Sequence, residues 1–164
     1  MTQSLITVLL WFAAISCGLL AGLYFAFSAF IMTALGRIDR AAGIAAMNAI
    51  NTTILRSLFM PLFLGSSLAS LILAGVALFR WGLPGSAAML VGGTIYVVGM
   101  FVVTMVFNVP HNNALMADDS STPEGADVWA RYLKDWTFWN HVRTASSTMA
   151  MIFFIAAISV RSTT

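Results

Sequence analysis

Residues 5–35 read LITVLLWFAAISCGLLAGLYFAFSAFIMTAL and contain no charged side chain. A helix needs roughly 20 consecutive apolar residues to cross the hydrocarbon part of a bilayer, so this stretch predicts a transmembrane helix. The apolar run is far longer than the roughly 7–15 residues of a signal-peptide core, and no basic segment precedes it. We therefore expect a helix that is retained in the protein.

Three further stretches are long and apolar enough to span a membrane, at about residues 57–79, 86–107 and 142–160. The chain is 60% hydrophobic and only 9% charged, whereas soluble domains have about 25% charged residues. We therefore predict one all-α domain over residues 1–164, a four-transmembrane-helix bundle. Its helices cover roughly residues 5–35, 57–79, 86–107 and 142–160, and a long polar loop covers residues 108–140.

Short interfacial helices are expected beside the four spans. In residues 40–55 the apolar side chains recur at spacings of three and four, which is typical of an amphipathic helix that lies at the interface or extends the second span. In residues 128–139 the side chains of Trp129, Tyr132, Trp136 and Trp139 recur at the same spacings, as in an aromatic belt at headgroup depth. The acidic run between Asp118 and Asp127 is expected to be a solvated linker.

Two polar runs hold most of the candidate chemistry, NVPHNN at residues 108–113 and WTFWNHVR at residues 136–143. They flank the predicted loop and therefore share one membrane face, where Asn48, Asn51 and Arg56 form a third polar patch. Polar side chains in a membrane helix are costly and usually face protein or a cavity. Three such patches on one face predict a functional site.

The candidate catalytic residues are His141, Arg143 and Asn140. Histidine titrates near neutral pH and suits a general base. Asn140 and Arg143 are three residues apart and share a helix face. The arginine could bind an anionic ligand through its planar fork, or extend to the lipid headgroups. The candidate substrate-binding residues are the nearby amides and indoles: Asn48, Asn51, Asn108, Asn112, Trp136 and Trp139.

Other function classes lack support in the sequence. His111 and His141 could approach each other, but no third potential ligand occurs at a spacing typical of metal sites, so we expect no metal. No nucleophile elbow, phosphate-binding glycine loop or basic nucleic-acid patch is present.

The polar face carries six basic residues and the opposite face only Arg80 and Arg161, which favours a cytoplasmic polar face. The six are Arg37, Arg40, Arg56, Arg131, Lys134 and Arg143.

Gly18 and Gly22 form a G-x-x-x-G spacing, which lets another helix approach closely. The partner could be a helix of the same bundle, where Gly92, Gly93 and Gly99 offer a small face, or a second copy in a homo-oligomer. The single cysteine, Cys17, lies inside the first helix and cannot form an internal disulfide.

Together these residues carry a family resemblance. The matching segments are FIMTAL (residues 30–35), Met47, Asn48, Asn51, NVPHNNAL (residues 108–115), Trp129, Trp136 and WNHVRT (residues 139–144). On them the chain resembles the DUF1772 family, also called the anthrone oxygenase family of small four-helix membrane proteins. The resemblance covers nearly the whole chain. It implies oxidation of an anthrone to an anthraquinone by molecular oxygen, without haem, flavin or nicotinamide, and many members are bacterial, which suggests the bacterial inner membrane.

We therefore hypothesise a cofactor-independent oxygenase. A phenolic lipophile would enter from the bilayer into a pocket walled by Trp136, Trp139 and Met47, and His141 would remove its acidic ring proton. Arg143, with Asn112 and Asn140, would stabilise the resulting enolate. The alternative is a non-catalytic membrane protein that binds a small lipophile or packs as a subunit of a larger complex. Side chains that converge on a cavity open to the bilayer would favour the enzyme or the binder.

Overall fold

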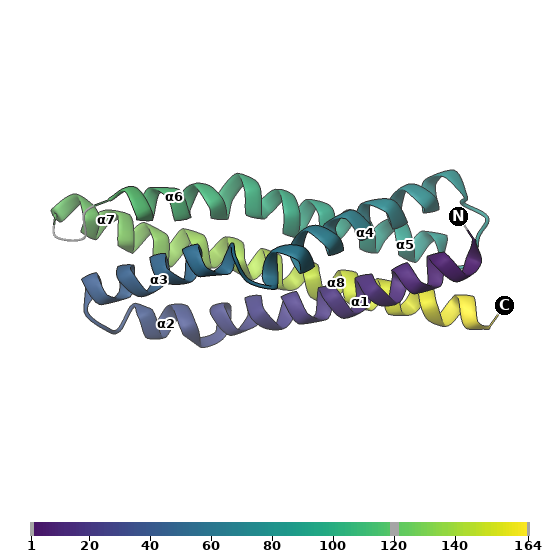
Figure 1. The fold of residues 1–164 in the computed structure, drawn as a ribbon, viewed down its shortest axis with the longest axis horizontal. Helices are drawn as coiled ribbons and strands as arrows, with labels where there is room; N and C mark the ends of the chain where they lie inside the picture. The colour runs from purple at the N-terminus through teal and green to yellow at the C-terminus, as the bar shows by residue number, and fades with distance from the viewer. Residues whose placement is uncertain (1, 119–121, 164) are drawn as a thin grey trace.

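The computed structural model describes residues 2–118 and 122–163. Asp119, Ser120 and Ser121, which belong to the predicted acidic linker, lie outside the described residues. Within the described ranges, four continuous helices are long and apolar enough to cross a membrane (Figure 1). They are Gln3–Leu35, Phe59–Phe79, Ser86–Ala117 and Pro123–Ser162. The predicted all-α, four-span architecture is confirmed.

Three of these helices contain π-helical segments. The elements of the first helix are α1 (Gln3–Ala26), the π-helix η1 (Phe27–Ile31) and α2 (Met32–Leu35). The next two elements are α3 (Arg40–Ile54) and the spanning helix α4 (Phe59–Phe79). The third spanning helix consists of α5 (Ser86–Tyr96), the π-helices η2 (Val97–Val102) and η3 (Thr104–Asn108), and α6 (Val109–Ala117). The fourth consists of α7 (Pro123–Arg131), the π-helix η4 (Tyr132–Trp136) and α8 (Thr137–Ser162).

The expected polar loop over residues 108–140 is instead largely helical, because α6 extends the third helix and α7 begins the fourth. Pro110 lacks an N–H donor and would normally end or kink a helix. Here it follows the π-helical turn η3, and such widened turns accommodate local disruption of the hydrogen-bond ladder. The next helix begins at Pro123, with Thr122 accepting a hydrogen bond from the Gly125 N–H as its N-cap. The expected interfacial helix over residues 128–139 is therefore continuous with the fourth span.

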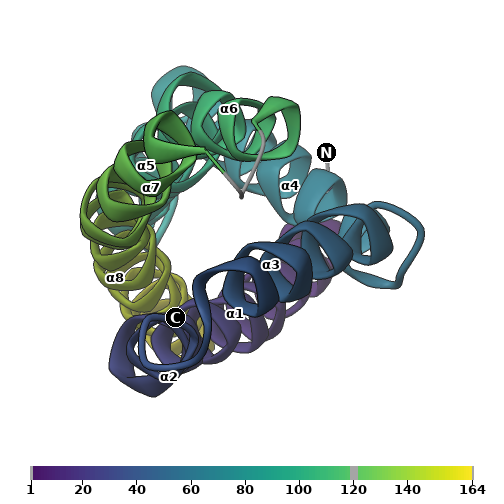
Figure 2. The same ribbon diagram turned by 90° about the vertical axis from the view of Figure 1, so that its left-hand side faces the viewer.

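The four spanning helices form a ring when viewed along the bundle (Figure 2). α1 packs against α8 and α4, and α5 packs against the same two helices from the other side. α1 and α5 therefore lie diagonally across the bundle. Both termini lie at one end, and α2, α3, α6 and α7 lie at the other.

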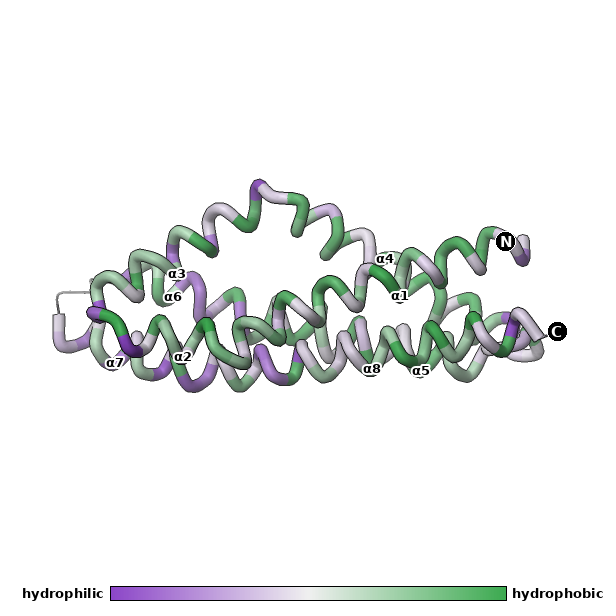
Figure 3. Tube along the Cα trace, turned by 90° about the horizontal axis from the view of Figure 1, so that it is seen from below, coloured by the Kyte–Doolittle hydropathy of each residue, from purple (hydrophilic) through white to green (hydrophobic). Residues whose placement is uncertain are grey.

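The length of α4 matches the thickness of a bilayer. Its 21 residues give roughly 30 Å at 1.5 Å per residue, which matches the hydrocarbon thickness. The other three spans have 32 to 40 residues and extend beyond the start of α4. Figure 3 shows that the chain from α3 to the start of α4 bows away from the rest of the bundle. This bow lies where one membrane boundary is expected.

The glycines of the third helix do not face Gly18 and Gly22, so that part of the expectation is wrong. The diagonal placement of α1 and α5 directs them elsewhere: a Cβ on Gly93 would lie 2.5 Å from the Ser70 carbonyl oxygen of α4. A Cβ on Gly18 would lie 2.9 Å from the Met151 sulfur of α8, whereas one on Gly22 would meet no described atom within 4 Å. Gly18 therefore packs within the chain. A homo-oligomer through this face stays a prediction.

Two hydrophobic clusters divide the bundle along its length. The membrane cluster joins small and large side chains of α1, α4, α5 and α8 near the termini, among them Leu10, Cys17, Leu73, Met89 and Phe154. The pocket cluster lies at the opposite end and consists of Phe27, Met32, Ile44, Met47, Leu115, Trp129, Tyr132 and Trp136. Between these clusters lies the candidate site.

Candidate functional site

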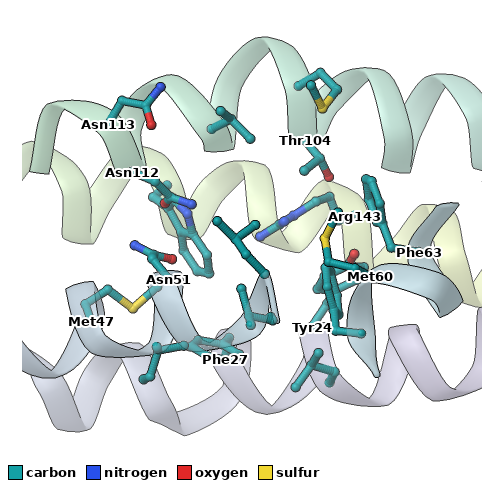
Figure 4. A pocket seen from close by; sticks show the side chains of 18 of the residues that line it. Tyr24, Phe27, Met47, Asn51, Met60, Phe63, Thr104, Asn112, Asn113 and Arg143 are labelled. Atoms are coloured by element: carbon teal, nitrogen blue, oxygen red, sulfur yellow. The ribbon is translucent and has the colours of Figure 1, made fainter. Parts of the chain in front are cut away.

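A cavity of about 350 Å³ opens between the bowed segment and the other helices (Figure 4). Its walls are mostly apolar, with arginine, asparagine, tyrosine and threonine as the polar exceptions. The lining residues are Leu23, Tyr24, Phe27, Met47, Ile50, Asn51, Ile54, Leu55, Phe59, Met60, Phe63, Thr104, Met105, Val109, Asn112, Asn113, Met116, Trp136 and Arg143. All four long helices and α3 therefore contribute to one cavity.

Part of the cavity wall is exposed at the surface of the protein. Four lining residues are themselves exposed: Leu55 at the end of α3, and Met105, Asn113 and Met116 of the third helix. Three of these four side chains are apolar, so the rim suits contact with lipid. Because Leu55 lies just before the start of α4, the cavity opens close to the expected membrane boundary.

Arg143 is the charged residue of the cavity wall. Its side chain is only 5% exposed, and its guanidinium donates to Asn140 Oδ1 at 2.7 Å. The guanidinium carbon lies 4.5 Å from the ring centroid of Tyr24 and 5.0 Å from that of Trp136. Its Nε is buried without a hydrogen-bond partner, and no carboxylate of the described residues forms an ion pair with it. A buried cation without a counter-ion is costly, so this position favours an anionic ligand group.

Asn140 holds Arg143 in place from behind the cavity wall. It is fully buried, and its Nδ2 donates to the Tyr24 carbonyl oxygen and to Ser28 Oγ, both at 2.7 Å. Its Oδ1 accepts from Arg143. All polar atoms of this amide are therefore used to orient the arginine and to join α8 to the first helix.

π-helical turns surround the cavity. η1 contributes Phe27, η3 contributes Thr104 and Met105, and η4 contributes Trp136. π-helical turns are rare and occur frequently at functional sites, because they change the direction of side chains within an otherwise regular helix. Their presence on three helices at the same level supports a site here.

A second polar group lies at the end of the cavity near α3 and α6. Tyr132 Oη donates to Asn112 Oδ1 at 2.8 Å and accepts from Asn51 Nδ2 at 3.5 Å. The Tyr132 ring stacks between Trp129 and Trp136, with centroid distances of 5.8 and 5.6 Å. Trp129 and Tyr132 are therefore buried in the pocket cluster, instead of lying in an aromatic belt at the headgroups.

The structure brings together four of the predicted site residues, Asn51, Asn112, Trp136 and Arg143, and also Met47 in the expected wall. The side chain of His141 is exposed on α8, outside the cavity lining. It lies two residues from Arg143, and neighbours at this spacing point away from each other on a helix.

The remaining candidates support the cavity from outside its lining. Trp139 stacks on Phe107 at a centroid distance of 3.6 Å, joining the third and fourth helices. Asn108 donates to the Trp136 carbonyl oxygen at 3.2 Å. Asn48 lies on α3 beside the lining residue Met47. Asn140 positions Arg143 as described above.

His111, the other histidine, donates from Nδ1 to the Phe107 carbonyl oxygen at 2.6 Å and so bonds within its own helix. No group of three or more His, Cys, Asp or Glu side chains that could hold a metal ion occurs among residues 2–118 and 122–163.

Sequence reasoning missed several lining residues, chiefly Tyr24, Phe63 and Thr104. Phe63 lies on α4 among other large apolar side chains and gave no signal. Tyr24 is the one tyrosine of residues 5–35, a stretch without charged side chains. Buried tyrosines usually need a polar neighbour, so Tyr24 could have been noticed.

Comparison with known proteins gives one match. The family model described as "Anthrone oxygenase" matches residues 47–153, which include both polar runs and most of the cavity lining. Searches of curated protein sequences and of solved structures gave no significant match.

Proposed function

Because the chain belongs to the anthrone oxygenase family, we propose that it is a membrane oxygenase that oxidises an anthrone-like phenolic lipophile with molecular oxygen. The observation that carries the proposal is Arg143, a buried cation without a described carboxylate partner in the wall of an apolar cavity. An enolate or phenolate oxygen is the kind of group that such a site would stabilise.

The ligand reaches the site from the bilayer. The exposed apolar residues Leu55, Met105 and Met116 at the rim support lateral access. A flat aromatic ligand would lie between Phe27 and Trp136 on one side and the aliphatic and methionine side chains of α3 and α4 on the other. A partly apolar cavity with a few polar groups is typical of small-molecule sites.

Arg143 acts on the charge that develops in the reaction. The ring CH₂ of an anthrone loses a proton to give an enolate, whose oxygen would be bound by the guanidinium. No histidine, aspartate or glutamate belongs to the described cavity lining, so water at the mouth would accept the proton. His141, the base expected from the sequence, is exposed outside the cavity lining and would not take part in this step.

The enolate then reacts with oxygen. Electron transfer from the enolate to O₂ and recombination form a C–O bond at the former CH₂ carbon, which gives a hydroperoxide after protonation. Loss of water from the hydroperoxide leaves the second carbonyl of the quinone. One anthrone and one O₂ thus give one anthraquinone and one water, and the substrate supplies all the electrons.

Oxygen uptake by the purified protein in lipid nanodiscs with anthrone tests the proposal, with empty nanodiscs as the baseline. Removing a group that stabilises an oxyanion typically costs about 100- to 1,000-fold in rate, and we expect this loss in Arg143→Met. Arg131→Met is the matched control, because Arg131 is exposed on the same helix outside the cavity lining. Uptake by the wild type equal to that of empty nanodiscs would refute the oxygenase. Binding of the anthrone without uptake would favour the non-catalytic lipophile-binding alternative.

We also propose that the protein lies in a bacterial inner membrane with the cavity end in the cytoplasm. The basic residues support this orientation: five of the six lie in α3, its flanks and the α7–η4 segment at the cavity end, whereas Arg80 and Arg161 lie at the other. In a Cys17→Ser background, an impermeant maleimide added to intact cells should label Gly82→Cys but not Ser57→Cys. The reverse pattern would invert the orientation.

A further inference from the structure

The end of the cavity near α3 and α6 contains two asparagines whose amides are fixed by one tyrosine. Tyr132 is 1% exposed, and its hydroxyl donates to Asn112 Oδ1 and accepts from Asn51 Nδ2. Both asparagines line the cavity, whereas Tyr132 stands behind them. Figure 4 shows the two amides side by side, with Arg143 extending into the same cavity from another helix.

The chemistry of a hydroxyl group determines what the two amides present to the cavity. A tyrosine hydroxyl has one hydrogen, so it donates to one amide oxygen and accepts from the other amide's NH₂. This leaves Asn51 Oδ1 as an acceptor and Asn112 Nδ2 as a donor, and neither atom has a partner among the described residues. Neither is among the fully buried atoms without a partner, so both retain some exposed surface. Reversing both amides would leave the same pair, one acceptor and one donor.

We infer that this pair binds a neutral hydroxyl group of the ligand. A hydroxyl donates to the amide oxygen and accepts from the amide NH₂, so it satisfies both. A ketone oxygen would leave the amide oxygen without a donor, and an ionised oxygen would face that amide oxygen unfavourably. The inference extends the proposed function, because it gives the ligand an anionic oxygen at Arg143 and a neutral hydroxyl at the opposite edge.

Trp136 separates the two polar ends of the cavity. The Arg143 guanidinium carbon lies 5.0 Å from the Trp136 ring centroid, and the same indole stacks on Tyr132 with centroids 5.6 Å apart. A flat aromatic skeleton with oxygens on opposite edges could therefore lie along the indole and reach both ends. In this arrangement Tyr132 is a positioning residue that acts through Asn51 and Asn112.

The test compares two probes that differ by one hydroxyl, 2-hydroxyanthraquinone and 2,6-dihydroxyanthraquinone. Their dissociation constants are measured by quenching of tryptophan fluorescence in nanodiscs, corrected for partition into empty nanodiscs. One satisfied hydrogen bond corresponds to about tenfold in affinity, so the wild type should bind the dihydroxy probe about tenfold more tightly. Tyr132→Phe keeps the ring stack but releases the amides, and the ratio of the two constants should fall to near one.

Tyr96→Phe is the matched control. Tyr96 is also fully buried, but its hydroxyl bonds to Ser66 at 2.7 Å within the membrane cluster, so this variant should keep the tenfold ratio. Asn112→Leu removes the donor directly and should also abolish the ratio, even if Tyr132→Phe does not fold. A wild-type ratio near one, or a ratio unchanged in Tyr132→Phe and Asn112→Leu, would overturn the inference. If anthrone oxidation fails while the ratio and its loss persist, the oxygenase is refuted and the hydroxyl site stands.

Discussion

The two ends of this bundle use the same helices for opposite purposes. Near the termini, α1, α4, α5 and α8 pack so closely that a Cβ on Gly93 would approach the Ser70 carbonyl oxygen to 2.5 Å. At the other end, the segment from α3 to the start of α4 bows away from the rest of the bundle (Figure 3), and the wall of the cavity beside it contains an unpaired Arg143 Nε and an unpaired Trp136 Nε1. Local departures from close packing are expected where a protein binds something. The contrast indicates that one end provides stability and the other provides recognition.

Most of the π-helical turns follow the same division. Among the described residues, η1, η3 and η4 contribute side chains to the cavity wall, whereas η2 contributes Met100 to the membrane cluster, which is otherwise built mainly from regular α-helix. In the first helix, the carbonyl oxygen of Tyr24, just before η1, accepts a hydrogen bond from Asn140 Nδ2. The backbone itself therefore takes part in positioning Arg143.

The largest expected effect on stability lies at the tightly packed end. Gly93→Ala should lower the free energy of unfolding by about 1–3 kcal/mol, because the new methyl group would press on the backbone of α4. Gly75→Ala on α4 is the control, since a Cβ there meets no described atom within 4 Å and alanine favours a helix. Thermal unfolding in detergent, followed by tryptophan fluorescence, measures both. Equal stability of the two variants would contradict the close packing.

At the cavity end we expect a change of the opposite sign. Arg143→Met removes a buried cation that has no described counter-ion, so the free energy of unfolding should rise by about 1–2 kcal/mol. The same variant should lose oxygen uptake, as argued above. The same unfolding assay measures the gain. A marked loss of stability would instead mean that the bond from Arg143 to Asn140 holds the fold together, and the division between the two ends would fail.

The smallest expected effect belongs to His141, which lies at the cavity end but outside the cavity lining. His141→Ala should leave oxygen uptake within about twofold and stability within about 0.5 kcal/mol, as is usual for exposed sites. Oxygen uptake with anthrone over a range of pH is the measurement. A loss comparable to that of Arg143→Met would restore His141 as the general base.

Much of the fold followed from local properties of the sequence. Apolar runs of sufficient length predicted the four spans, because a bilayer sets the length of a helix that crosses it. Asn140 and Arg143 were paired correctly from their spacing, and they are joined by a hydrogen bond of 2.7 Å. The boundaries of the third and fourth helices were wrong, since the polar runs predicted a loop over residues 108–140, whereas α6 and α7 extend both helices into it. The π-turns in these helices give no sequence signal.

The sequence by itself determined which residues lie in the membrane, which are polar, and which neighbours share a helix face. These properties depend on hydropathy and on the period of a single helix. Only the tertiary structure decided how each helix is rotated against the others, and thus that Arg143 points inward, that His141 points outward, and that Tyr132 meets both Asn51 and Asn112. That rotation results from side-chain packing between segments far apart in the chain and from the π-turns that shift the helical phase. The cavity is a product of that packing, so no single stretch of sequence could have predicted it.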